Sequence, residues 1–211
     1  MADANGRLSY LALGDSYTIG EGVAESARWP VQMARALRAR GIALDDPRII
    51  AKTGWTTGEL DAALDAAEPL GRWDFVSLLI GVNNQYRGLA VADYAREFAA
   101  LLARATGYAG GRGDRVLVLS IPDWGVTPFA FAQGRDRARI AEELDGFNAA
   151  ARATCALRGV AFVDVTGVSR ALGGAPAMLA DDGLHPSAAM YGEWAELALP
   201  VARARLAGAT A

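Results

Sequence analysis

The stretch Leu8-Ser-Tyr-Leu-Ala-Leu-Gly-Asp-Ser16 joins an almost continuous apolar run to a short polar turn. An uninterrupted apolar run is typical of a strand covered on both faces, as in a parallel sheet, whereas a half-exposed strand alternates apolar and polar residues. The turn begins with glycine and ends with Ser16, which carries a potential nucleophile. The pattern therefore predicts a buried strand that delivers a serine to its carboxyl end.

The same alternation of short apolar runs and longer helical stretches continues along the chain. With residues 8–13, the predicted strands are residues 48–51, 75–80, 116–121 and 160–165. The predicted helices are residues 30–40, 57–67, 90–106 and 137–158, and a last one from Pro186 to the C-terminus with a kink or restart at Pro200. Gly41, Gly107 and Gly159 stand where glycine would end a helix. The order predicts a three-layer α/β/α sandwich with a mainly parallel five-stranded sheet.

Length and composition favour one domain spanning residues 1–211, because roughly 100–200 residues is usual for a domain and no linker divides the chain. Hydrophobic residues make up 52% and charged residues 21%, which excludes intrinsic disorder. The net charge is −3 and no basic stripe is present, so we expect no nucleic-acid partner. The polar first residues and the absence of a run of roughly 18 apolar residues favour a cytoplasmic protein without a membrane segment.

The chain holds one cysteine, Cys155, and one histidine, His185. A disulfide within the chain is therefore excluded, a Cys/His zinc site is nearly so, and we expect no metal or cofactor. The phosphate-binding motif GxxxxGK[ST], the dinucleotide motif GxGxxG, the GxSxG turn and HExxH are all absent. Cys155 lies in an alanine-rich helical stretch, where we expect a buried and inert thiol.

Three polar residues suggest a nucleophilic site. Ligands of open α/β sheets bind beyond the carboxyl ends of the strands, where Ser16 is predicted to lie. A serine hydroxyl needs a base, and His185 is the one imidazole in the sequence. Asp182 stands three residues before it, which lets the carboxylate accept a hydrogen bond from one ring nitrogen while the other faces the serine. The alternatives are a helix cap at Ser16, a turn cap at Asp182, and Asp181 in the place of Asp182.

A tetrahedral intermediate formed on Ser16 would also need hydrogen-bond donors for its oxyanion. Candidates are the backbone N–H of Ser16, the backbone of Gly54 and the side-chain amide of Asn83, although Gly54 and Asn83 can equally be ordinary turn residues. Aromatic residues in or near the same loops are candidates to line the substrate pocket, with core packing as the alternative. They are Trp55, Tyr86, Trp124 and Phe129.

The four blocks Gly14-Asp15-Ser16, Gly54, Gly81-x-Asn83 and Asp182-x-x-His185 resemble, in order, the signature blocks of the SGNH/GDSL hydrolase family. The resemblance implies a flavodoxin-like sandwich that hydrolyses carboxylic esters or thioesters. It also implies the following roles: Ser16 as nucleophile, His185 as base, Asp182 as its orienting partner, and Ser16, Gly54 and Asn83 as oxyanion donors. The chain departs from the family pattern at Tyr17, where leucine is usual and the pocket mouth would narrow, and at Asn84, where many members have aspartate.

We therefore predict a metal-independent serine esterase that cleaves small or medium acyl groups from a small-molecule ester. Tyr17, Trp55, Tyr86 and Trp124 are its predicted substrate-binding residues. Two alternatives stay open: an acyltransferase that uses the same acyl-enzyme, and a non-catalytic ligand-binding module on the same fold. The sequence does not determine the oligomeric state.

Overall fold

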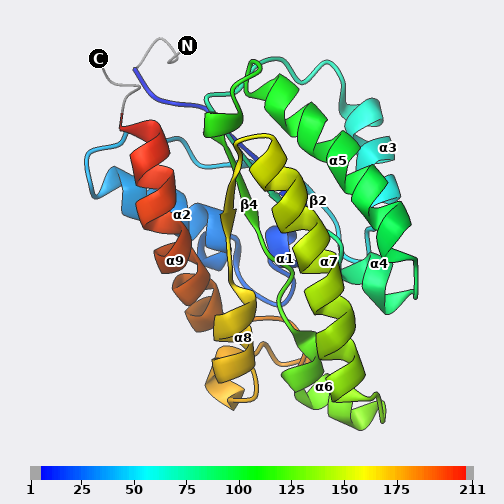
Figure 1. Ribbon diagram of the computed structural model, residues 1–211. Helices are drawn as coiled ribbons and strands as arrows, with labels where there is room; N and C mark the ends of the chain where they lie inside the picture. The colour runs from blue at the N-terminus through cyan, green and yellow to red at the C-terminus, as the bar shows by residue number, and fades with distance from the viewer. Residues whose placement is uncertain (1–5, 208–211) are drawn as a thin grey trace.

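A computed structural model describes residues 6–207 and contains a sheet of five strands, all parallel (Figure 1). The strands are β1 (Tyr10–Gly14), β2 (Arg48–Ala51), β3 (Phe75–Leu79), β4 (Val116–Leu119) and β5 (Ala161–Val163). Their order across the sheet is β2-β1-β3-β4-β5. The predicted strands therefore all exist, although several are shorter than the apolar runs that predicted them.

Helices cover both faces of the sheet, as Figure 1 shows, so the predicted α/β/α sandwich is confirmed. On one side lie α2 (Trp29–Arg38) and α9 (Ala188–Leu206), and on the other lie α3 (Thr57–Ala67), α5 (Val91–Tyr108) and α7 (Arg137–Leu157). Four short helices sit in the loops that follow strands: α1 (Ser16–Ile19), α4 (Val82–Tyr86), α6 (Pro128–Ala132) and α8 (Thr166–Leu172). Single turns of 3-10 helix occur at Glu25–Ala27, Gly113–Arg115, Trp124–Val126 and Pro176–Met178.

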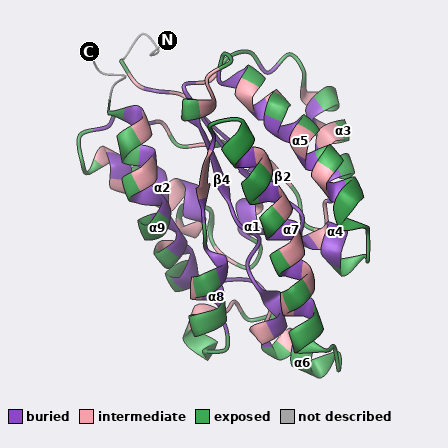
Figure 2. Cartoon of the chain, in the orientation of Figure 1, coloured by how far each residue is buried: buried purple, intermediate pink, exposed green. Residues whose placement is uncertain are grey.

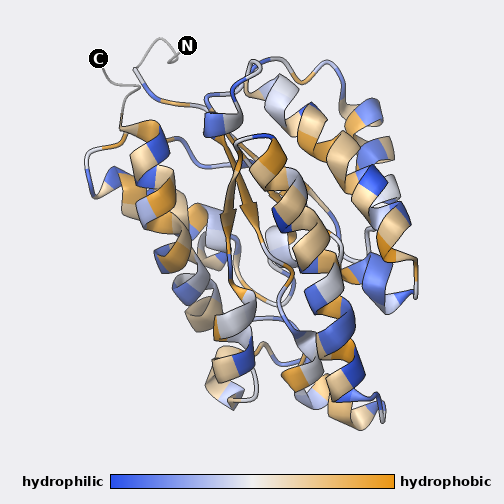
Figure 3. Cartoon of the chain, viewed as in Figure 1, coloured by the Kyte–Doolittle hydropathy of each residue, from blue (hydrophilic) through white to orange (hydrophobic). Residues whose placement is uncertain are grey.

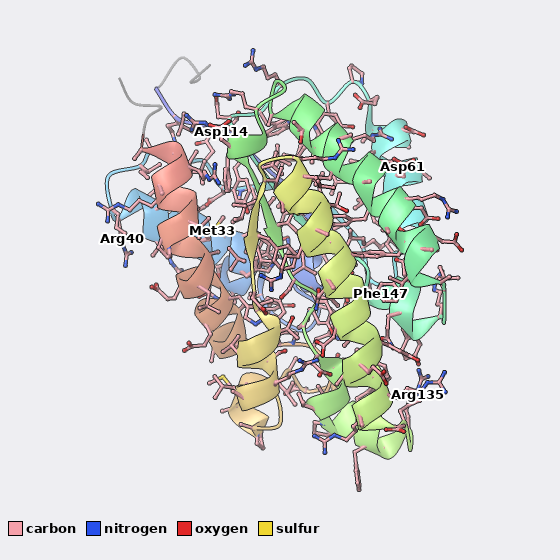
Figure 4. The ribbon with its side chains drawn as sticks, in the orientation of Figure 1. Met33, Arg40, Asp61, Asp114, Arg135 and Phe147 are labelled. Atoms are coloured by element: carbon pink, nitrogen blue, oxygen red, sulfur yellow. The ribbon has the colours of Figure 1, made fainter. Side chains whose placement is uncertain are left out.

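The core lies on both faces of the sheet. Strands β1, β3 and β4 are buried along their whole length (Figure 2) and carry mostly apolar residues (Figure 3), as the continuous runs predicted. Figure 4 labels one buried side chain from each helical layer, Met33 of α2 and Phe147 of α7. The ring of Phe147 packs against that of Tyr94 in α5, with 4.7 Å between their centroids.

Some helix ends differ from expectation. Gly41 and Gly159 follow α2 and α7 with left-handed φ angles of +83° and +65°, as predicted. The prediction for Gly107 is wrong, because this residue lies inside α5. Gly110 ends that helix instead, with φ +69°, and the next N–H donates back to the carbonyl of Thr106 at 2.8 Å. Helix α9 runs without interruption through Pro200, so no restart occurs there.

The order of the strands determines where a ligand site can form. Strand β1 lies between β2 and β3, so the chain crosses to one edge after β1 and returns to pair on the other side of it. A crevice at the carboxyl ends of β1 and β3 follows from this reversal. The loops after β1, β2 and β3 meet there, together with α1 and α4. Within residues 6–207, no helix has both the length and the apolar character that crossing a membrane requires.

Candidate active site

Ser16 is held by a tight turn between β1 and α1. Asp15 caps the helix, because its Oδ1 atom accepts the N–H of Tyr17 at 3.0 Å. Gly14 is required by close packing: a Cβ atom at this position would lie 2.2 Å from Oγ1 of Thr18 and 2.4 Å from the carbonyl oxygen of Leu79. The serine therefore sits at the start of a helix folded tightly against the sheet, where 5% of its surface remains exposed.

Asp182 and His185 form a compact unit in the loop before α9. The Oδ2 atom of Asp182 lies 2.6 Å from Nδ1 of His185, and its Oδ1 atom accepts the backbone N–H groups of Leu184 and His185, each at 2.9 Å. Partial burial acts to raise the pKa of Asp182, but the hydrogen bonds from His185 and Leu184 outweigh it, and the pKa is lowered. Asp182 thus makes both the turn-capping and the ring-orienting contact.

A cavity of about 200 Å³ brings the predicted residues together at the carboxyl ends of the strands. Its walls come from five separate segments of the chain. They are Ser16, Tyr17, Thr53, Gly54, Val82, Asn83, Tyr86, Trp124, Phe129, Leu184 and His185. The ring of Tyr17 packs edge-on against that of His185, with centroids 5.9 Å apart. Ser16 and His185, 169 positions apart in the printed numbering, therefore share one pocket.

The loop after β2 contributes Gly54 to this cavity. The N–H of Trp55 donates to the carbonyl of Lys52 at 3.3 Å, and Gly54 has a φ of +89°, which together define a type II turn. The Nδ2 atom of Asn83 donates to the carbonyl of Trp55 at 2.9 Å. Because an amide nitrogen carries two hydrogens, this bond holds Asn83 in place and leaves one donor for a ligand.

Aromatic rings form another wall of the cavity. Trp124 is buried, and its indole N–H donates to Oε1 of Gln85 at 2.8 Å, which fixes the ring. The ring meets Tyr86 and Phe129 edge-on, at centroid distances of 5.4 and 6.3 Å. The guanidinium of Arg135, at the lower right of Figure 4, lies 5.4 Å from the centroids of both Tyr86 and Trp124. This wall is therefore rigid and apolar, with one cation stacked against it.

The structure places the predicted pocket residues unequally. Tyr17, Tyr86 and Trp124 line the cavity, whereas Trp55 does not. The ring of Trp55 packs against the core, and its backbone carbonyl accepts a hydrogen bond from Asn83. Sequence reasoning missed three lining residues, Thr53, Val82 and Leu184. Each directly precedes a residue of a signature block: Gly54, Asn83 or His185. This adjacency could have predicted that they line the cavity.

Two other titratable groups, Asp15 and Cys155, have pKa values shifted by burial. Asp15 is fully buried, and this burial raises its pKa to about 7, while its Oδ2 atom has no hydrogen-bond partner. Burial also raises the pKa of the Cys155 thiol to about 12, and this residue does not line the cavity. Among the residues that the structure describes, no group of three or more His, Cys, Asp or Glu side chains is arranged to hold a metal ion.

Comparisons with known proteins identify the family and the fold. The sequence profile of the GDSL-like Lipase/Acylhydrolase family matches residues 12–192. No curated protein sequence matches significantly.

Solved structures share the fold at low identity. The crystal structure of TesA is 22% identical with a TM-score of 0.73, covering 94% of this chain and 99% of that one. A lipase/acylhydrolase from Enterococcus faecalis is 22% identical with a TM-score of 0.68, covering 94% and 97%. Axe2, an acetylxylan esterase from Geobacillus stearothermophilus, is 16% identical with a TM-score of 0.67, covering 94% of each chain.

Proposed function

The chain belongs to the GDSL-like lipase/acylhydrolase family and is thus a carboxylic ester hydrolase; from this premise we propose that Ser16 is its nucleophile and forms an acyl-enzyme. His185 acts as the general base and Asp182 orients its ring. The observation that carries the proposal is the 2.6 Å contact between Asp182 and Nδ1 of His185, a residue that lines the same cavity as Ser16. With Nδ1 engaged, Nε2 is the ring nitrogen that serves the serine.

The reaction then proceeds in two halves. Nε2 of His185 takes the proton of Ser16 as Oγ attacks the ester carbonyl, and a tetrahedral intermediate forms. The protonated imidazole, stabilised by the Asp182 carboxylate, gives this proton to the departing alcohol. Water enters, His185 removes its proton, and the resulting hydroxide attacks the acyl-enzyme. The second tetrahedral intermediate then collapses: the acid leaves and the protonated His185 returns the proton to Oγ of Ser16.

The oxyanion of each tetrahedral intermediate is proposed to receive three hydrogen bonds. The donors are the backbone N–H groups of Ser16 and Gly54 and the free side-chain N–H of Asn83. All three residues line the one cavity, and removing a single donor of this kind typically lowers turnover by about 10²–10³.

The substrate is proposed to carry a small or medium acyl group. At about 200 Å³, the cavity lies below the roughly 300 Å³ at which pockets for drug-sized ligands begin. Its walls of Val82, Trp124, Phe129 and Leu184 offer apolar contact but no unpaired charge for a polar acyl chain.

The test compares wild type with Ser16→Ala in stopped-flow hydrolysis of p-nitrophenyl acetate and butyrate, with Ser26→Ala as a control at an exposed serine. We expect turnover by wild type and Ser26→Ala, and a fall of about 10³ or more in Ser16→Ala, as removal of a triad member causes. Mass spectrometry of the quenched wild type should find the acyl group on Ser16. Equal rates in all three proteins, each folded by circular dichroism, would refute the assignment. Ester products formed with added alcohols would instead identify an acyltransferase.

A further inference from the structure

Side chains of α4 and of the residue that caps its C-terminus hold the loop that carries Gly54. Arg87, this cap residue, donates from Nη2 to the carbonyl oxygen of Gly54 at 2.6 Å. The same guanidinium forms an ion pair with Glu59, at 3.2 Å from Nη2 to Oε2. Asn83 holds the next carbonyl, that of Trp55. Two consecutive carbonyl groups of this loop thus accept hydrogen bonds, one from α4 and one from the residue that caps it.

These bonds leave two adjacent peptide groups with both of their polar atoms engaged. In the peptide that joins Gly54 to Trp55, the carbonyl accepts a hydrogen bond from Arg87 and the N–H donates to the carbonyl of Lys52. In the peptide that joins Trp55 to Thr56, the carbonyl accepts Asn83 and the N–H donates to Oε2 of Glu59 at 2.8 Å. Both peptide planes are therefore fixed at their carbonyl and at their N–H ends.

The N–H of Gly54 belongs to the peptide just before these two. Two rotatable bonds of Gly54, N–Cα with φ +89° and Cα–C, connect it to the plane that Arg87 holds. This is the central peptide of a type II turn, and glycine at this position accepts a φ of either sign. A rotation of this peptide turns the N–H away and presents the Thr53 carbonyl in its place. The N–H reaches the oxyanion only while Gly54 itself stays in place, and the Arg87 bond to its carbonyl fixes the peptide on its C-terminal side.

We infer that Arg87 is a positioning residue for oxyanion stabilisation, which it serves by immobilising the Gly54 carbonyl and hence the Gly54 N–H. The inference rests on the proposed function, because it assumes that this N–H donates to the oxyanion. Preorganised donors stabilise a transition state without reorganising as charge develops, so a loosened donor lowers kcat more than it changes substrate binding.

The ion pair between Arg87 and Glu59 contributes little to the stability of the fold. The Arg87 and Glu59 side chains are 47% and 45% exposed, and exposed ion pairs are weak because water screens them. Thr56 and Glu59 already form a capping box that starts α3 without Arg87. Loss of Arg87 should therefore affect turnover well before it affects folding.

The experiment measures kcat and KM on p-nitrophenyl butyrate for wild type, Ser16→Ala, Arg87→Gln and Arg87→Lys. We expect Arg87→Gln to lower kcat by about 10–100-fold, less than complete loss of an oxyanion donor, with KM changed by less than about threefold. Arg87→Lys should regain part of kcat, because lysine keeps the charge but lacks the forked geometry. Affinity for a boronic acid, which forms a tetrahedral adduct on the nucleophilic serine, should fall in parallel with kcat.

One matched control isolates the Gly54 contact. Arg96→Gln removes an exposed arginine whose ion pair with Asp93 lies within α5. It should keep kcat within about twofold. Wild-type kcat in Arg87→Gln, while Ser16→Ala is inactive, would overturn the role of Arg87 alone. Equal rates in wild type and Ser16→Ala would overturn the proposed function together with it.

Discussion

Asp182 binds His185 through both of its carboxylate oxygens, Oδ2 to the ring nitrogen Nδ1 and Oδ1 to the backbone N–H. One side chain therefore shapes the loop and orients the ring within it. The three-residue spacing makes this possible, because the loop between them turns back and its ends lie side by side. The charge of Asp182, which acts on the His185 ring, can therefore be tested separately from its hydrogen bond to the backbone, which shapes the loop.

Replacing Asp182 with asparagine should separate these two contributions. The amide oxygen can still accept a backbone N–H, but the amide nitrogen donates to Nδ1 and favours the wrong tautomer. We expect kcat to fall by about 10²–10⁴ while the melting temperature changes by a few degrees at most. Steady-state kinetics with thermal unfolding measure both. Asp181→Asn is the control, and an equal loss in the two variants would contradict the role given to Asp182.

Replacing Asp15 with asparagine should change how stability depends on pH. Burial raises the pKa of Asp15 to about 7, above the value near 4 expected in the unfolded chain, so the folded state binds more protons between these values. The free energy of unfolding of wild type should therefore decrease as pH rises from about 4 to about 7 relative to that of Asp15→Asn, and the difference should then level off. Asparagine keeps the acceptor for the N–H of Tyr17.

Urea unfolding at intervals between pH 4 and 8 measures this difference. Since other groups titrate in both proteins alike, the informative quantity is wild type minus variant. Two parallel curves would show that Asp15 does not change protonation in this range.

Asn84 should not tolerate the aspartate that is common in the family. Its Oδ1 atom accepts the N–H of Thr57 at 3.0 Å, and its Nδ2 atom donates to the Thr57 hydroxyl at 2.6 Å. That hydroxyl donates in turn to Glu97, so it has no hydrogen left for a second carboxylate. Asn84→Asp should therefore lower the free energy of unfolding by about 1–3 kcal/mol, the cost of an unsatisfied buried polar group.

A double-mutant cycle with Glu97→Gln checks this explanation. The glutamine removes one carboxylate and supplies an N–H, so Glu97→Gln should restore part of the stability lost in Asn84→Asp. Denaturant unfolding of the four proteins measures the coupling. Additive losses would mean that the Thr57 hydroxyl does not link the two sites.

Leu184 should limit the length of the acyl chain. It lines the main cavity and also a second hollow of about 20 Å³ behind it, whose walls include Met178, Met190 and Trp194. Leu184→Ala joins the two spaces. Since each buried methylene is worth about 0.8 kcal/mol, the ratio of kcat/KM for hexanoate over butyrate esters should rise several-fold.

Val82→Ala is the control for cavity size, because Val82 lines the main cavity but not the second hollow. Kinetics on p-nitrophenyl esters of increasing length measure the ratio. The same shift in both variants would assign the effect to general widening rather than to the wall formed by Leu184.

The elements that could be predicted from sequence are those with a strong local signal. Continuous apolar runs predicted all five strands, and helical periodicity predicted the long helices to within a few residues. The short helices α1, α4, α6 and α8 were missed, because four to seven residues are too few to show a period. The end of α5 was predicted at Gly107 rather than at Gly110, because the closely spaced glycines are equivalent candidates in the sequence and only packing selects one.

The amino-acid sequence by itself determined which chemistry is available: one serine after a buried strand, one histidine, and an aspartate three residues before it. These features are local, because the end of a strand, a turn and a side-chain cap within it each depend on residues that are close in the sequence. The tertiary structure alone decided which distant groups meet. It turned Trp55 toward the core and brought Arg87 onto the carbonyl of Gly54, 33 residues away. The physical reason is that such contacts follow from how the layers pack, and packing depends on the whole sheet and its helices at once.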